Sequence, residues 1–188
     1  MYIWVALTFE KEFEDSLRKY AKMVGLENNL DLTAFYLPQH ITLKISFPCK
    51  DSDVKSITEY LMSYLSKTDA FDVEVDKMEL LESNYNIIWM NIAESDILRK
   101  LHNEINQELL DNYKIGLHDY DGENFKFHST LFIDNVVPIT NYRKAIKQLQ
   151  KFDFIRNQTI KSACIGCSKS GKIGSYEISE IIYLNNKR

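Results

Sequence analysis

The sequence predicts an α+β protein with one domain over residues 1–188, built as two similar lobes of antiparallel sheet that face each other across a cleft. Hydrophobic periodicity gives the element order β-α-β-α-β-β-α-β-α-β-β, and such mixtures are typical of antiparallel sheets with helices outside. Two strands carry the same tetrad, His40-Ile41-Thr42-Leu43 and His128-Ser129-Thr130-Leu131, 88 positions apart (128 minus 40). Each tetrad follows a helix and a polar loop and precedes another helix, which indicates two related halves.

Strands and amphipathic helices alternate in the first half of the chain. Residues 2–9 are apolar and predict a strand, and residues 10–26 carry apolar side chains at helical spacing, with Gly25 where a helix stop is expected. Residues 40–47 alternate apolar and polar without a break, which is the pattern of a strand with one buried face and one open face. A second helical stripe runs from Val54 to Leu65, and Asp51 or Ser52 is its expected cap.

The second half repeats this alternation. Residues 71–75 alternate as a strand, and residues 86–92 form a compact apolar strand after a polar turn. A helix is expected at 96–112 with Ser95 as its cap, and the loop 116–124 leads to the strand at 125–133. The chain closes with a helix at 141–152 and strands near 159–167 and 176–184, separated by a turn that contains glycine.

Composition sets limits on the function. The chain has 188 residues, of which 45% are hydrophobic and 27% charged, as in ordinary soluble domains. Its net charge of −4 argues against tight binding to long nucleic acid, which depends on neutralising phosphates. The apolar opening, residues 1–7, lacks a basic leader and is too short to span a membrane. We therefore expect a cytoplasmic monomer with no membrane contact.

No metal or cofactor is expected. Cys164 and Cys167 form a CxxC pair, but a structural zinc site usually has a second pair and Cys49 stands alone. A redox pair would open a helix, whereas residues 168–172 read as a turn, so small side chains near a strand end are the favoured interpretation. Asp119 and Asp121 have the start of a calcium loop without its spacing or its final Glu.

The two tetrads indicate chemistry at phosphorus. Two imidazoles with pKa values near neutrality form an acid and base pair, in which one ring removes a proton while the other donates one. A hydroxyl beside each ring can bind a non-bridging phosphate oxygen and fix its orientation. We therefore predict His40, Thr42, His128 and Thr130 as the catalytic residues of an in-line displacement that needs no metal.

These residues give the sequence a family resemblance. It resembles the 2H phosphoesterase superfamily, which includes bacterial 2′-5′ RNA ligase-like proteins and 2′,3′-cyclic phosphodiesterases. The resemblance extends from the opening strand at 3–7 through both tetrads and the middle strand at 87–90 to the closing strand at 177–184. It implies a bilobal fold with the motifs on facing strands, and a metal-free reaction on phosphodiesters by two His and two Thr. The acidic loop at 119–123 and the scarcity of Arg depart from the bacterial ligase-like pattern and fit a compact substrate better than long RNA.

Four further residues are candidates for substrate binding. Lys44 and Lys126 share the motif faces and would add positive potential for phosphate, with an ordinary solvated lysine as the alternative. Tyr36 and Tyr120 lie just ahead of the tetrads and would stack a base, with packing as the alternative.

The two remaining histidines are interpreted as non-catalytic. His102 lies at the edge of the apolar face of its helix and is expected to be structural, and His118 is expected to be an exposed loop residue.

Three functions stay open, each with a small nucleotide or short oligonucleotide as partner. The first is a metal-independent phosphodiesterase acting on a 2′,3′-cyclic phosphate or a 2′-5′ linkage. The second is a hydrolase of cyclic oligonucleotide signals, as implied by phage-encoded members of the superfamily that blunt host defence. The third is a non-catalytic nucleotide-binding module, although binding alone does not require two proton carriers.

Overall fold

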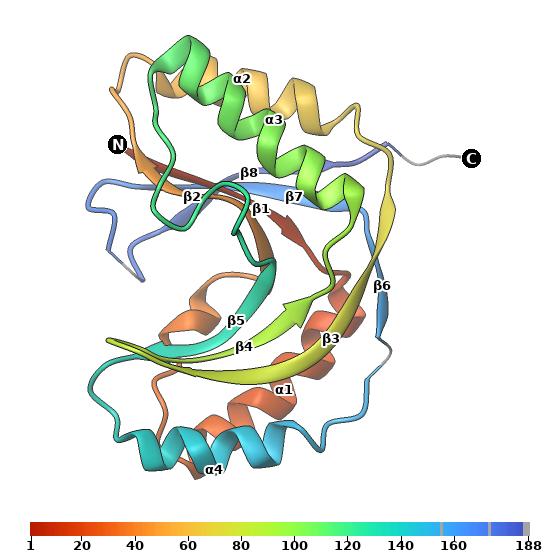
Figure 1. Ribbon diagram of the computed structural model, residues 1–188, viewed down its shortest axis with the longest axis vertical. Coiled ribbons are helices and arrows are strands. Elements are labelled where there is room, and N and C mark those ends of the chain that lie inside the picture. Colours follow the sequence, from red (N-terminus) through yellow and green to blue (C-terminus); the bar gives the residue numbers. More distant parts are fainter. Residues whose placement is uncertain (155, 173, 186–188) are drawn as a thin grey trace.

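The computed structural model describes residues 1–154, 156–172 and 174–185, so the end of the predicted domain, 186–188, lies outside the described residues. Two antiparallel sheets of four strands each form the centre of the molecule, with the helices on their outer faces (Figure 1). This arrangement confirms the predicted α+β fold of two lobes. None of the helices in the described part of the chain is long and apolar enough to cross a membrane.

Sheet one has the strand order β2-β1-β7-β8, and sheet two has the order β5-β4-β3-β6. The strands of sheet one are β1 (Tyr2–Thr8), β2 (His40–Pro48), β7 (Ser162–Ser168) and β8 (Glu177–Tyr183). The strands of sheet two are β3 (Phe71–Glu82), β4 (Asn86–Ile92), β5 (His128–Asp134) and β6 (Asn157–Ile160). In each sheet the strand with a tetrad, β2 or β5, is therefore an edge strand.

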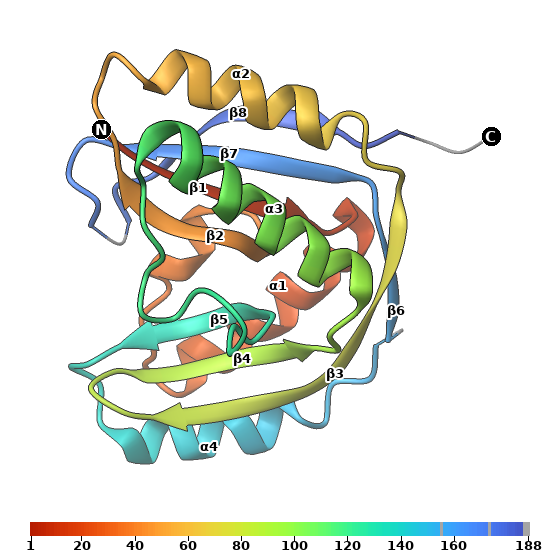
Figure 2. The ribbon, with the colours of Figure 1, turned by 45° about the horizontal axis from the view of Figure 1, so that its top comes forward.

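Two of the helices pack on the sheet of the opposite lobe from the strand that precedes them. The helices α2 (Val54–Leu65) and α3 (Asp96–Tyr113) cover sheet one, and α1 (Lys11–Glu27) and α4 (Ile139–Leu149) cover sheet two (Figure 2). Thus α1 follows a strand of sheet one but packs on sheet two, and α3 follows a strand of sheet two but packs on sheet one. A short 3-10 helix, η1 (Thr33–Tyr36), precedes β2. This exchange joins the lobes through one continuous apolar core.

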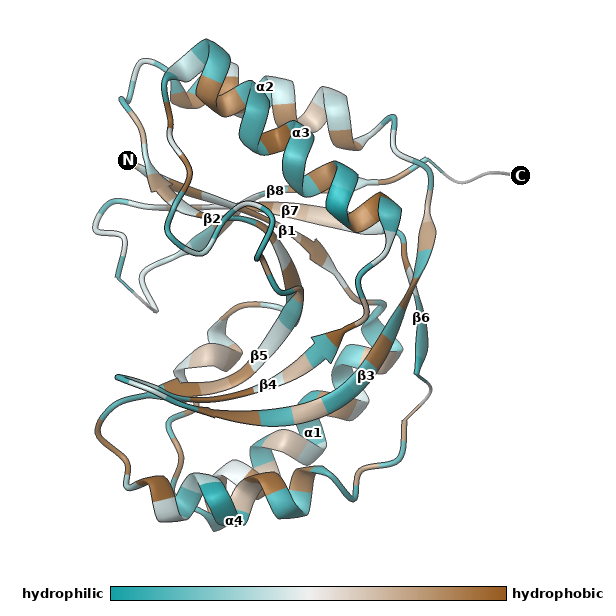
Figure 3. Cartoon of the chain, viewed as in Figure 1, coloured by the Kyte–Doolittle hydropathy of each residue, from teal (hydrophilic) through white to brown (hydrophobic). Residues whose placement is uncertain are grey.

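The hydrophobic pattern explains why these segments form these elements. Hydrophobic residues concentrate along the strands and recur along the helices (Figure 3). In α3 the buried positions include Leu98, Leu101, Ile105 and Leu109, which repeat at helical spacing. The helix begins as predicted, because the Ser95 hydroxyl accepts a hydrogen bond from the backbone N–H of Leu98.

Three local predictions need correction. The cap of α2 is Asp53, without a side-chain hydrogen bond, so the prediction of Asp51 or Ser52 is wrong. The strand that begins at Phe71 continues to Glu82, because it pairs first with β6 and then with β4. The single strand predicted at 159–167 is two strands, since β6 pairs in sheet two and β7 pairs in sheet one.

Candidate active site

The two tetrads lie on strands that contact each other. Strands β2 and β5 form the adjoining edges of the two sheets. The side-chain amide of Gln39, the residue before His40, donates a 2.6 Å hydrogen bond to the backbone carbonyl of Thr130. The side chains of His40, Thr42, His128 and Thr130 are all partly exposed. The structure thus brings the four predicted residues together where the lobes meet.

Both imidazoles are held in the same way. Nδ1 of His40 lies 2.8 Å from the carbonyl oxygen of Pro38, and Nδ1 of His128 lies 2.8 Å from that of Lys126. A carbonyl oxygen only accepts, so Nδ1 is the donor in both rings. Each ring is therefore left with Nε2 as the nitrogen that can take up or release a proton.

A tryptophan supports each imidazole. The ring centroids of Trp4 and His40 are 4.6 Å apart with a 40° tilt, and those of Trp89 and His128 are 4.3 Å apart with a 34° tilt. Trp4 lies in β1 and Trp89 in β4, the strands that pair with β2 and β5. The sequence interpretation missed both residues, although the only two Trp of the chain occur in these two matching strands.

Burial and mutual charge set the protonation of the two rings. Burial lowers the pKa of His40 and of His128, and the hydrogen bonds to the backbone carbonyls oppose this by raising each pKa. A positive charge on His128 lowers the pKa of His40 further. A charge on His128 therefore disfavours a charge on His40.

The threonine hydroxyls are available for a ligand. Thr42 and Thr130 each follow the histidine of their tetrad by two residues and lie on the same strand face. Across the described ranges, neither hydroxyl has a hydrogen bond to another protein group. Two hydroxyls beside two imidazoles can orient the oxygens of one phosphate group.

The prediction that Lys44 lies on the open face is wrong. Its side chain is only 1% exposed and forms an ion pair with Asp121. Opposite β1, the pairs are Ala6 with Thr42 and Val5 with Lys44, so β2 contains one extra residue at this point. Such a bulge interrupts the alternation of a strand, and Lys44 is consequently buried next to Leu43.

The other predicted binding residues are exposed. Lys126 is exposed, Tyr36 is 80% exposed and Tyr120 is 73% exposed, so packing does not account for either tyrosine. His118 is also exposed, as predicted, and its ring stacks on Tyr120 at 5.4 Å. His102 is fully buried, which agrees with the predicted structural role.

Cys164 lies buried in β7 and Cys167 is partly exposed in the same strand, and both are free thiols. The predicted position of the CxxC pair within a strand is therefore confirmed. Among the residues that the structure describes, no three His, Cys, Asp or Glu side chains gather as metal ligands.

The fold and the site define a class of protein: two lobes of antiparallel sheet with a His-x-Thr tetrad on each adjoining edge. The sequence model of the 2′-5′ RNA ligase superfamily matches residues 13–165, which include both tetrads. The chain belongs to this superfamily.

Solved structures share the fold over almost the whole chain. TT0787 of Thermus thermophilus gives a TM-score of 0.66 at 13% identity and covers 100% of both chains. The apo form of Escherichia coli LigT gives 0.63 at 13% identity and covers 98% of this chain and 97% of the other. A putative phosphoesterase of Staphylococcus aureus strain Newman is 27% identical over 108 residues, which are 57% of this chain and 60% of the relative.

Proposed function

We propose that the protein is a phosphodiesterase that acts on a nucleotide or short oligonucleotide, at a 2′,3′-cyclic phosphate or a 2′-5′ linkage, without a metal. The observation that carries the proposal is the matched pair of imidazoles, His40 and His128, each bound at Nδ1 to a backbone carbonyl. Membership of the superfamily supports it. Support also comes from solved structures of E. coli LigT with phosphate, 3′-AMP and ATP, which share the fold.

The reaction uses one neutral and one charged imidazole. The neutral imidazole removes a proton from the attacking water through Nε2, and a bond forms between the water oxygen and phosphorus. The bond from phosphorus to the leaving ribose oxygen breaks on the opposite side, and the charged imidazole donates its proton to that oxygen. Thr42 and Thr130 donate hydrogen bonds to the non-bridging oxygens and hold the phosphate in line.

Exposed groups around the tetrads suit a short substrate. We assign Lys126, which is exposed two residues before His128, to binding the negative charge of the phosphate. We assign the exposed rings of Tyr36 and Tyr120 to stacking with bases. The buried Lys44 has no role in this binding surface. Because the chain has a net charge of −4, a substrate with few phosphates is expected to bind better than long RNA.

The test is a substrate panel assayed before and after exhaustive chelation with EDTA. It contains 2′,3′-cyclic nucleotides, 2′-5′-linked dinucleotides, cyclic oligonucleotides and a long RNA. We expect turnover of the cyclic phosphate or the 2′-5′ dinucleotide, unchanged by EDTA. Loss of turnover in EDTA with recovery in Mg²⁺, Mn²⁺ or Zn²⁺ contradicts the metal-free reaction, and turnover of cyclic oligonucleotides alone assigns the protein to signal degradation. Binding without turnover of any substrate favours a binding module.

A further inference from the structure

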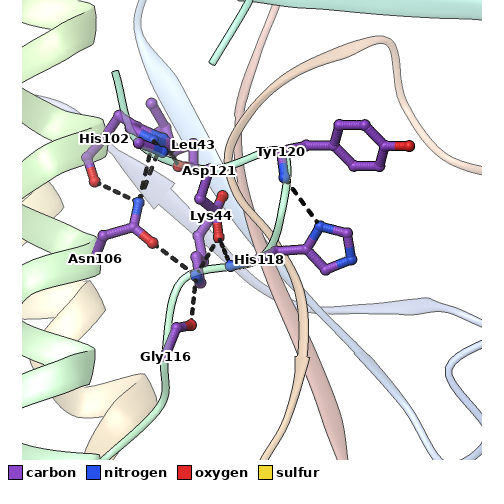
Figure 4. Close-up of polar contacts among 9 residues, drawn as sticks. Leu43, Lys44, His102, Asn106, Gly116, His118, Tyr120 and Asp121 are labelled. Atoms are coloured by element: carbon purple, nitrogen blue, oxygen red, sulfur yellow. Dashed lines mark hydrogen bonds and ion pairs between the residues drawn. The ribbon is translucent and has the colours of Figure 1, made fainter. Parts of the chain in front are cut away.

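The segment 114–127, here called the strap, connects the two lobes. It leaves α3, which covers sheet one, and enters β5 of sheet two (Figures 1 and 2). The strap contains the acidic residues for which the proposed function has no role. Beneath it lies a group of buried polar side chains from β2, α3 and the strap itself, which Figure 4 shows together: Lys44, His102, Asn106 and Asp121.

The centre of this group is a buried ion pair. The Lys44 ammonium lies 2.5 Å from Asp121 Oδ2, 2.6 Å from Asn106 Oδ1 and 3.3 Å from the carbonyl oxygen of Gly116. The side chains of Lys44 and Asp121 are 1% and 0% exposed. Asp121 Oδ2 also accepts a 2.8 Å hydrogen bond from the backbone N–H of His118. The ion pair thus fixes the strap to β2 at two of its backbone groups.

Removal of two charges from water opposes folding, so such a pair is weak evidence for added stability. A role in fixing one arrangement of the chain is the better attested use of buried ionic groups. The position of this pair fits that role, because Lys44 is two residues after Thr42 and Asp121 is seven residues before His128.

Helix α3 also forms hydrogen bonds with this part of the strap. Arg99 donates hydrogen bonds to the carbonyl oxygens of Gly122, at 2.7 Å, and Phe125, at 2.8 Å. His102 Nε2 accepts a 3.1 Å hydrogen bond from the N–H of Gly122, while its Nδ1 donates at 2.7 Å to the carbonyl oxygen of Leu43. One neutral ring therefore bridges β2 and the strap, and it also stacks on Phe125 at 4.3 Å.

We propose that Lys44, Asp121 and His102 are positioning residues that fix the His128 imidazole relative to the His40 imidazole. They hold the strap to β2 just after the first tetrad, and the strap continues directly into the second. None of the three touches the reacting phosphate. Their effect on turnover rests on the proposed phosphodiesterase function, whereas their effect on the strap and on the two imidazoles does not.

The test replaces the ion pair by an apolar pair, Lys44→Met with Asp121→Leu, so that no buried charge is left without a partner. Amide hydrogen exchange reports on the strap, because the N–H of His118 loses its acceptor. We expect this amide to exchange faster. We also expect turnover to fall by about 10-fold to 10²-fold, because misplacement of a catalytic group by about 1 Å costs on that order. If this double variant does not fold, Lys44→Met with Asp121→Asn, which also leaves no buried charge, is measured in the same way.

The matched control is Lys161→Met, which breaks the exposed Lys161–Glu10 ion pair (2.6 Å) by the same substitution and should change neither quantity. NMR titration of His40 and His128 tests the geometry without any substrate. In the unchanged protein, charging one ring lowers the pKa of the other, and the double variant should weaken this coupling. The proposal is overturned if the strap amides exchange freely while turnover and the coupling between the His40 and His128 titrations stay unchanged. If no substrate is turned over at all, the proposed function fails and the titration still tests the positioning.

Discussion

Gly166→Ala should disturb the site from the neighbouring strand. A Cβ at position 166 in β7 would lie 2.0 Å from Nε1 of Trp4, whereas ordinary contact begins at 3.4 Å. The indole would have to move by about 1.4 Å (3.4 minus 2.0). This movement would displace the imidazole of His40, because the two rings are in contact. Overpacking of this kind costs about 1–3 kcal/mol of stability. A catalytic group misplaced by roughly 1 Å costs about 10²-fold in rate, so we expect turnover to fall by about that factor.

The assay is turnover of a 2′,3′-cyclic nucleotide together with thermal unfolding. Gly116→Ala is the matched control, because a Cβ there meets nothing within 4 Å, and it should retain both turnover and stability. Adding Trp4→Phe to Gly166→Ala removes the indole nitrogen that clashes and should recover part of the lost stability. Full turnover in a folded Gly166→Ala protein would refute the role of Trp4 as the support of His40.

Three further predictions concern stability. Ser95→Ala removes the α3 cap and should cost about 1 kcal/mol in denaturant unfolding; a loss near zero would contradict the cap. Gly25→Ala places a Cβ 2.7 Å from the Phe132 ring and should cost about 1–3 kcal/mol, measured the same way; unchanged stability would mean that α1 and β5 separate readily. Burial lowers the pKa of His102 in the folded protein, so the unfolded chain takes up the proton first as the pH falls through about 6.5. Stability should therefore decrease below that pH and depend less on pH in His102→Gln, and an unchanged pH dependence in that variant would contradict this.

Much of the fold was predictable because local patterns decide it. Residues 40–47 alternate without a break, and a strand forms there with His40 and Thr42 on the open side. The bulge within this strand has no signal in the alternation, because it depends on pairing with β1. Lys44 therefore looks like an open-face residue in the sequence and is buried in the structure.

The candidate site was only partly predictable for the same reason. The repeated tetrads identify four side chains, and a repeat can be recognised without any structure. Trp4 and Trp89 support the imidazoles from neighbouring strands, and such contacts depend on strand pairing. Asp121 belongs to a stretch whose composition suggests an exposed acidic loop, yet its carboxylate is buried by the ion pair with Lys44.

The most direct test of the account is the pH dependence of kcat/KM on a 2′,3′-cyclic nucleotide for four proteins: the unchanged chain, His40→Ala, His128→Ala and the variant with both replacements. An acid and a base that act together predict a bell-shaped profile for the unchanged chain, with each replacement removing one limb. Each should cost about 10²–10⁴ in turnover, the usual scale of positioned acid–base catalysis. Replacing both histidines together should reduce turnover by a factor much smaller than the product of the two single factors. A folded His128→Ala or His40→Ala protein that keeps full turnover and both limbs would contradict the account.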